Sequence, residues 1–285
     1  MSRLRAGSKL TSTGLRAPAD RAIAPVIVLL TLAFALFFVL PFAGLIDRGL
    51  RNGHVWSLLN TAQATDALIL SLWTSTLTVL LAILFGTPVA YLLARHRFPG
   101  KALVDAFIEL PIVLPPTVAG VALLTAFGRK GLIGEPIDRW TGFTFGFSTT
   151  AVVMAQLIVA APFYVRAAKS GFERLDAQME RVAFTLGASR ARTFYRIILP
   201  QAWPALLAGV VLCWARALGE LGATLIFAGN LQGTTQTMPL AIIQAFEGST
   251  LGLDGAIALS LLLLAVALAV LVLFRLAVAR NPAVP

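Results

Sequence analysis

Six long apolar segments constrain this chain more than any other feature of its sequence. They cover residues 24–46, 67–94, 103–127, 149–168, 205–228 and 255–279. Each is close to the roughly 20 apolar residues needed to cross the hydrocarbon core of a bilayer. Because backbone groups in lipid must find their hydrogen bonds within the protein, such segments form helices. The sequence therefore predicts an all-α, polytopic membrane protein with six spans and a transmembrane domain over residues 24–279.

The composition argues against several other classes of protein. Charged residues make up 13% of the chain, against about 25% in soluble domains. The net charge of +10 would suit nucleic acid, but Lys and Arg lie at the ends of apolar segments, as expected beside anionic lipids. The single cysteine, Cys213, cannot form a disulfide framework, and His54 and His96 lack metal-ligand spacing. We expect membrane lipids as partners, no nucleic acid and no metal site.

Proline and glycine predict irregularities inside the apolar segments. Gly86 and Pro88 in the second segment predict a kink that neighbouring helices must shield. Pro111, Pro115 and Pro116 predict the same for the third. The first segment is longer than the 7–15 apolar residues of a signal peptide, so we interpret it as a retained helix.

The basic residues predict the orientation in the membrane. Of the 23 Lys and Arg residues, 17 fall on one side, in the N-terminal tail, at 95–101, at 166–196 and near the C-terminus. Positive charge concentrates in cytoplasmic loops. The sequence thus predicts a cytoplasmic N-terminal tail over 1–23, a cytoplasmic C-terminal tail over 280–285, and a multi-pass protein of the inner (cytoplasmic) membrane. The loop at 229–254, with no basic residue, falls outside.

A polar, arginine-rich elbow over about 173–200 interrupts this apolar sequence. The pattern predicts a short helix, a break near Gly187, and a second short helix that ends at Leu199 and Pro200 because proline stops it. Apolar residues fall at helical spacing on one face. They are Met179, Val182, Ala183 and Leu186. Such a face suits docking into a partner's groove; an amphipathic helix lying on anionic lipid is the alternative.

The stretch RVAFTLGASRARTFYRIILP, residues 181–200, resembles the EAA motif of ABC importer permeases. That motif reads E-A-A, three residues, Gly, nine residues and I-x-L-P. The matching residues are Ala183, Gly187, Ile197, Leu199 and Pro200. Arg181 and Val182 stand where the motif has Glu and Ala, and Glu180 lies one residue before it. The resemblance implies a coupling helix that fits a cleft in a separate cytoplasmic ATPase.

The chain has no GxxxxGK[ST] motif, and therefore no phosphate-binding loop of that kind. An energy-coupled membrane subunit without this loop needs an ATPase partner. We expect no cofactor in this chain, because ATP and Mg would be bound by the partner subunit, and we expect no catalytic residues.

The second informative stretch runs from Ala215 to Ile242. Arg216 and Glu220 are expensive charges inside a span, and one helical turn separates them. They form either a structural ion pair or part of the translocation pathway. Gly219 and Gly222 would let neighbouring helices approach closely. Uncharged polar residues near the outer mouth suit either an ordinary loop or a pathway or docking role. They are Thr224, Asn230, Thr234, Thr235, Gln236 and Thr237.

This stretch is similar to the fifth-span region of molybdate importer permeases, in which RALGE-GAT and TQTMPLAI recur. Sulfate/thiosulfate permeases are close relatives of that group. The similarity implies a homodimer of this chain, two cytoplasmic ATPase subunits and an extracytoplasmic molybdate-binding protein. It also implies that substrate choice rests largely with the binding protein, so tungstate and sulfate or thiosulfate stay open as alternatives.

The residues also bear on two other classes of membrane protein. An enzyme within the membrane would need convergent catalytic groups, and the best candidates, Asp105 and Glu109, more simply favour a helix dipole. An ion-driven carrier would show inverted repeats with broken helices and would lack the spacing of the elbow. The sequence favours the importer subunit over both.

Overall fold

The computed structural model describes residues 18–51, 61–248 and 252–279, and regular structure in these ranges is helical. The predicted tail residues 1–17 and 280–285 lie outside the described residues. The chain divides into two units, Met1–Arg51 and Asn52–Pro285.

The first unit contains α1, Pro18–Arg51. The helix begins earlier than residue 24 and ends later than residue 46, the limits of the predicted first span. From Pro25 onward its side chains are exposed within the unit, apart from Leu45 and Gly49. Residues Pro25–Arg51 have a mean hydropathy of 2.8. A helix that is apolar all round is typical of a membrane span.

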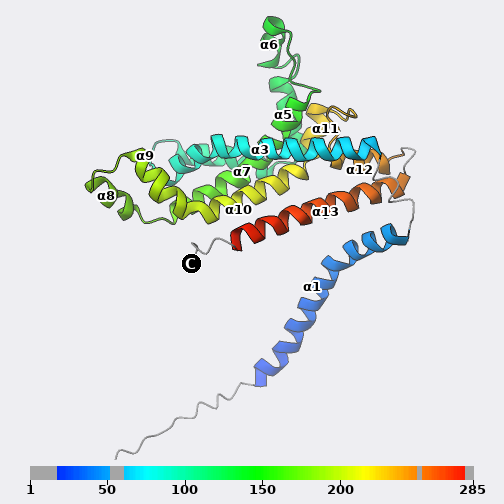
Figure 1. The fold of residues 1–285 in the computed structure, drawn as a ribbon, viewed down its shortest axis with the longest axis horizontal. Helices are drawn as coiled ribbons and strands as arrows, with labels where there is room; N and C mark the ends of the chain where they lie inside the picture. The colour runs from blue at the N-terminus through cyan, green and yellow to red at the C-terminus, as the bar shows by residue number, and fades with distance from the viewer. Residues whose placement is uncertain (1–17, 52–60, 249–251, 280–285) are drawn as a thin grey trace, which may run out of the picture. The chain divides into compact units, whose positions relative to one another are not determined.

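The core of the second unit is formed by α3 (Ala62–Arg95), α7 (Thr149–Glu173) and α10 (Leu199–Leu218), which lie side by side (Figure 1). Small residues allow their backbones to approach. A Cβ at Gly86 would meet Val165 at 3.0 Å, and one at Gly171 would meet Ala205 at 2.5 Å. The helix α3 is not interrupted at Gly86 or Pro88. Gly86 therefore allows α3 to pack closely against α7 and does not break the helix.

The third apolar segment is two helices where one kinked span was predicted. Helix α4 covers Lys101–Val113 and α5 covers Pro116–Phe127, with an angle of 117° between them. Leu114 is extended, as a residue before proline prefers, and Pro115 precedes the first turn of α5. Pro111 lies within α4 without ending it. The break therefore falls at the Pro115–Pro116 pair.

The fifth segment also differs from the prediction. After α8 (Ala177–Thr185), α9 (Arg190–Thr193) leads through a π-helical turn η1 (Phe194–Ile198) directly into α10. The prediction that Pro200 stops the second elbow helix was wrong, since the helical structure from Arg190 to Leu218 is continuous and is long and apolar enough to cross a membrane. Pro200 occupies the first turn of α10, where the wider π turn just before it accommodates the missing N–H. The segment then breaks after Leu218, and α11 (Gly222–Ala228) follows.

The predicted outer loop at 229–254 contains a helix, α12 (Met238–Phe246), before α13 (Gly252–Ala279). Met238, Ala241 and Ala245 are buried in a cluster with residues of α3 and α13. The loop prediction was wrong here because a nine-residue apolar helix is too short to be recognised as a span. A further short helix, α6 (Gly134–Thr141), lies between α5 and α7.

Five helical stretches of the described chain are long and apolar enough to cross a membrane, or six if the bent α4–α5 pair is one span. The prediction of an all-α polytopic protein is confirmed. The elbow with α8 and α9 lies at one end of the second unit, and α11 and α12 lie toward the other (Figure 1).

Candidate functional site

The elbow folds as a helix, a glycine turn and a second helix. Asp176 caps α8 by accepting a hydrogen bond from the backbone N–H of Gln178 at 2.8 Å. Gly187 has φ +79°, and the N–H groups of Gly187 and Ala188 donate to the carbonyls of Phe184 and Ala183. This is the glycine-based pattern that closes the C-terminus of a helix. The predicted break at Gly187 is present, and positive φ is the reason for glycine there.

The elbow exposes most of the apolar face that the sequence predicted for docking. Met179, Val182 and Leu186 are 48, 52 and 82% exposed. Ala183 is buried and packs inward. In a membrane protein, an apolar face that is exposed at one end of the folded unit is available either to a partner protein or to lipid.

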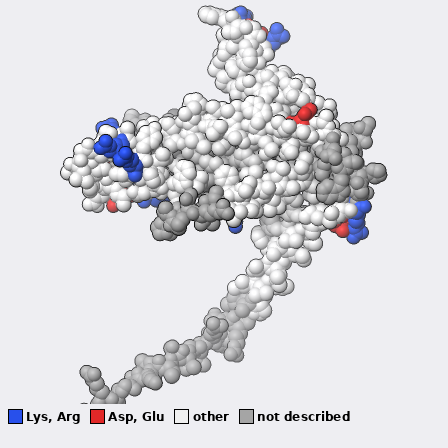
Figure 2. Space-filling view, in the orientation of Figure 1, with Lys and Arg blue, Asp and Glu red and all other residues white. Residues whose placement is uncertain are grey.

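The other predicted coupling residues differ in how far they are exposed. Arg181, Gly187 and Pro200 are exposed, whereas Glu180, Ile197 and Leu199 are half-buried. Arginines dominate the charge at this end of the second unit, where Figure 2 shows a dense basic group over the region of α8 and α9. The exposed arginines of the elbow are Arg174, Arg181, Arg190, Arg192 and Arg196.

Glu180 is turned toward the protein and forms an ion pair with Arg95, the last residue of α3. The Arg95 Nε and Glu180 Oε1 atoms are 3.0 Å apart, and the two side chains are 12 and 16% exposed. The Arg95 Nη1 group also donates to the carbonyl of Leu175 at 3.0 Å. Arg95 could not be predicted as the partner of Glu180, because the two residues are far apart in the chain and no local pattern relates them.

Aromatic rings pack beside this ion pair. Tyr91 contacts Phe172 and Phe194 edge to face, with ring centroids 5.6 and 5.1 Å apart. Such pairs contribute beyond their buried area. The ends of α3 and α7 and the π turn are thereby held together at the base of the elbow. Lys169 on α7 pairs with Asp105 on α4 at 2.5 Å, which gives Asp105 a structural partner.

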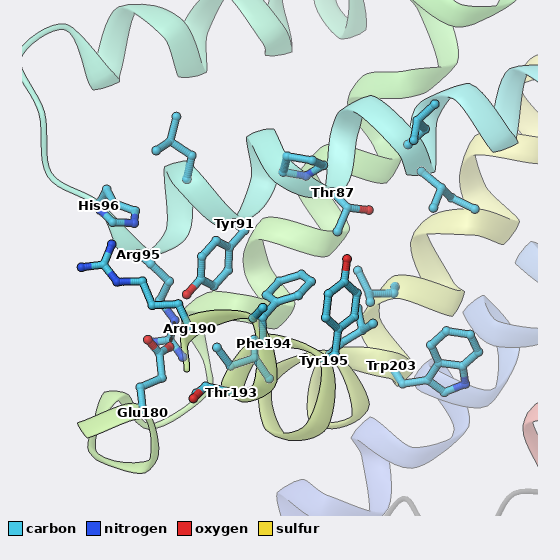
Figure 3. A pocket seen from close by; sticks show the side chains of 18 of the residues that line it. Thr87, Tyr91, Arg95, His96, Glu180, Arg190, Thr193, Phe194, Tyr195 and Trp203 are labelled. Carbon is cyan, nitrogen blue, oxygen red and sulfur yellow. Dashed lines mark ion pairs between the residues drawn. The ribbon is translucent and has the colours of Figure 1, made fainter. Parts of the chain in front are cut away.

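A cleft of about 1060 Å³ opens between α3, the elbow and α10. Figure 3 shows Tyr91, Arg95 and Glu180 gathered toward one end of it and Trp203 toward the other. Leu84, Leu207 and Val210 are among the apolar residues that line it. Its charged side chains, Arg95, Glu180 and Arg190, lie together at one end, where Glu180 neutralises Arg95.

At the far end of α10, Arg216 and Glu220 are in contact. The Arg216 Nη1 and Glu220 Oε2 atoms are 2.6 Å apart, and the Glu220 side chain is 1% exposed. The other carboxylate oxygen of Glu220 accepts the backbone N–H of Ala223 at 2.8 Å. Glu220 therefore ties the start of α11 to α10. These contacts favour the interpretation as a structural pair, and the function of the pair, structural or in the pathway, stays a prediction.

Gly222 and Gly219, the two glycines near the Arg216–Glu220 pair, differ in their surroundings. A Cβ at Gly222 would lie 3.1 Å from Pro116 Cβ, and one at Gly120 would lie 2.9 Å from the Ala223 Cα. These contacts place α5 directly against α11. Gly219, in contrast, is exposed, and among the described residues a Cβ there would meet only the Ala215 carbonyl of its own helix, so the close approach at Gly219 stays a prediction.

The polar residues expected in an outer loop are largely buried. Gln236 is 2% exposed, donates to Asn230 at 2.9 Å and accepts from Gln63 of α3 at 3.2 Å. Its amide also bonds with Gln244. Thr235 and Thr237 are buried, whereas Thr234 is exposed. The group therefore joins the start of α3 to α12 and its preceding loop.

Two predicted pathway residues hold buried hydroxyls without a partner among the described atoms. They are the Oγ1 atoms of Thr224 and Thr237. A buried polar group without a partner is destabilising by about 1–3 kcal/mol. The pathway role of both residues stays a prediction.

A second set of buried, hydrogen-bonded polar side chains lies along α3 and was not predicted from the sequence. Thr78 donates to Gln156 of α7 at 3.0 Å, and Gln156 donates to Thr74 at 3.2 Å. The Ser71 hydroxyl accepts the N–H of Met238 at 2.7 Å. Ser71, Thr74 and Thr78 recur at helical spacing, and this polar stripe within an apolar segment was the available signal.

The arrangement of these helices occurs in known transport proteins. A bacterial alginate ABC transporter, solved in complex with an alginate pentasaccharide-bound periplasmic protein, superposes with a TM-score of 0.75, covering 93% of this chain and 96% of that one. At 16% sequence identity, this likeness concerns the fold alone. The fold is that of an ABC importer permease.

The sequence comparisons establish the family. The family described as binding-protein-dependent transport system inner membrane component matches residues 83–284. This chain belongs to that family. It is a multi-pass membrane component of a transport system, and the position of the family in the inner membrane agrees with the predicted location.

Curated relatives match most of the chain. It is 43% identical to the molybdenum transport system permease protein ModB of Escherichia coli K12, over 71% of this chain and 88% of the relative. It is 38% identical to the molybdate/tungstate transport system permease protein WtpB of Thermococcus kodakarensis, over 79% and 83%. These matches agree with the resemblance found in the fifth apolar segment.

Proposed function

We propose that this chain is the membrane subunit of an ABC importer for molybdate, driven by ATP hydrolysis in a separate subunit. The family supplies the transport role, and the names of its relatives supply the substrate. The elbow carries the proposal for energy coupling. Its exposed apolar face and surrounding arginines form a surface suited to a groove in a partner protein.

The proposed assembly contains two copies of this chain, two cytoplasmic ATPase subunits and an extracytoplasmic molybdate-binding protein. ATP and Mg²⁺ are bound by the ATPase, and this chain contributes no catalytic group. The absence of a GxxxxGK[ST] sequence supports this division. The described residues also hold no group of three or more His, Cys, Asp or Glu that could bind a metal ion.

The electrostatics of the outer end support delivery by a binding protein. Arg216 is the basic residue of the fifth apolar segment, and Glu220 neutralises it at 2.6 Å. A free oxyanion there gains little compensation for its lost hydration. A docked binding protein raises the local concentration of the ion at the mouth. We expect molybdate to be favoured, then tungstate, with sulfate or thiosulfate third.

Purification of the tagged chain from its own cells in mild detergent tests this assembly. We expect one ATPase, identified by its phosphate-binding loop and by hydrolysis of ATP, for each copy of this chain. A soluble ATPase bound to the elbow would also support the cytoplasmic position of the elbow and of both tails. A chain that is recovered alone and intact, with no ATPase under any mild condition, would contradict the proposal.

A further inference from the structure

The buried acid of the elbow lies one residue away from the position where the EAA motif has glutamate. We propose that Glu180 is a positioning residue: through Arg95 it fixes α8 to the end of α3, and it does not contact the ATPase. This inference rests on the proposed function, because it concerns how the same elbow transmits movement.

The direction of the two neighbouring side chains supports this division. Glu180 is 16% exposed and lies 3.0 Å from Arg95, whereas the side chain of Arg181 is exposed. Successive residues of a helix point about 100° apart. The surface offered to a partner therefore carries a positive charge at the motif's acidic position, and the negative charge is turned inward.

Arg95 connects more than one segment of the elbow. Its Nη1 group donates to the carbonyl of Leu175, in the connection between α7 and α8, while its Nε group faces Glu180. One turn earlier on α3, Tyr91 contacts Phe172 of α7 and Phe194 of the π turn. The last turn of α3 thus contacts both sides of the elbow.

The far end of α3 contacts Gln236, which is one of the residues proposed for the pathway, and the first residue of α12. Ser71 accepts the N–H of Met238, and Gln63 donates to Gln236. Displacement of α8 by an ATPase would therefore be passed through the ion pair to α3, and through α3 to the start of α12. Because both charges are nearly buried, removal of either leaves its partner uncompensated and releases α8 from α3.

Four variants separate positioning from contact. Glu180→Gln and Arg95→Gln each break the pair, Arg95→Glu with Glu180→Arg reverses it, and Arg181→Gln changes the exposed neighbour. Each is purified with its ATPase, reconstituted in proteoliposomes and supplied with binding protein and molybdate. The measurements are ATPase bound per permease and molybdate transported per ATP hydrolysed.

We expect Glu180→Gln and Arg95→Gln to retain the ATPase while molybdate transported per ATP falls about tenfold. The charge-reversed pair should transport more per ATP than either single variant, although a carboxylate at position 95 cannot donate to the carbonyl of Leu175. Arg181→Gln should show the opposite result, with less ATPase bound and an unchanged ratio for the complexes that form.

Loss of ATPase binding in Glu180→Gln, to the degree seen in Arg181→Gln, would overturn the inference and make Glu180 a contact residue. An unchanged ratio in both single variants, or a charge-reversed pair no better than them, would also overturn it. If the single variants are not recovered from the membrane, the reversed pair decides. If the charge-reversed pair is not recovered either, the pair is needed for folding, and this result would also overturn the inference. Failure of the wild-type chain to bind an ATPase would instead contradict the proposed function.

Discussion

Two ion pairs lie near opposite ends of the helix bundle, and their burial differs. At the elbow, the side chains of Arg95 and Glu180 are buried to a similar degree, at 12 and 16% exposed. At the end of α10, Arg216 is 27% exposed while Glu220 is 1% exposed. A buried charge without a partner is strongly destabilising, whereas replacement of both charges is often tolerated. The Arg216–Glu220 pair should therefore respond asymmetrically to substitution.

We predict that Arg216→Gln lowers the folded yield more than Glu220→Gln does. The first change leaves a fully buried carboxylate unpaired, costing on the order of 3–5 kcal/mol. The second leaves an arginine that can reach water, and the amide oxygen of a glutamine at position 220 can still accept the N–H of Ala223. Size-exclusion yield and thermal unfolding in detergent measure the difference.

The double variant Arg216→Gln with Glu220→Gln provides the control. It should recover much of the yield lost in Arg216→Gln, since no buried charge remains. Normal yield and unfolding in both single variants, together with reduced molybdate uptake, would contradict a structural pair and place these residues in the translocation pathway.

Among the helices, some features of the elbow could be predicted from the sequence and others could not. Spacing alone predicted α8, its apolar face and the break at Gly187. The continuation of α9 through a π turn into α10 was not predicted, because Pro200 normally ends a helix and a π turn has no clear sequence signal. The pairing of Glu180 with Arg95 was also missed, since it depends on the packing of α3 against the elbow.

We predict that Gly187→Asp weakens ATPase binding about tenfold or more, because it adds bulk and an unpaired charge at the proposed contact. The turn itself should survive. A Cβ at Gly187 meets nothing within 4 Å, and aspartate tolerates positive φ at a cost of about 1 kcal/mol. ATPase retained per permease after purification is the measurement.

Gly142→Asp is a matched control for this change. Gly142 has φ +70° and, like Gly187, nothing within 4 Å of a Cβ, but it follows α6 and is not part of the elbow. It should insert and retain the ATPase normally. Equal retention in the two variants would favour the lipid-surface interpretation of the elbow.

For the chain as a whole, apolar length predicted the membrane class, because lipid permits few alternatives to helices, and the six predicted segments compare with five or six candidate spans among the described residues. It did not predict the 117° turn between α4 and α5. Both helices are apolar, so hydropathy does not change at the break, and Pro115 and Pro116 mark its position without fixing its angle. Helix α12 was missed because it is short and is buried by α3 and α13.

We expect substrate recognition, too, to belong to the complete assembly. The polar residues at 230–237 are largely occupied with joining α3 to α12, and Arg216 is neutralised by Glu220. A single chain therefore offers little that distinguishes one tetrahedral oxyanion from another. Selectivity for molybdate is expected to come from the binding protein that delivers it.

Uptake of labelled molybdate into proteoliposomes containing this chain and its ATPase, with ATP inside, is the most direct measurement of the proposed function. We predict rapid uptake when the binding protein is present and slow uptake without it, and little inhibition by excess sulfate. Efficient competition by sulfate would contradict the molybdate assignment. Equal rates with and without the binding protein would contradict delivery, and uptake that does not require ATP would contradict the importer itself.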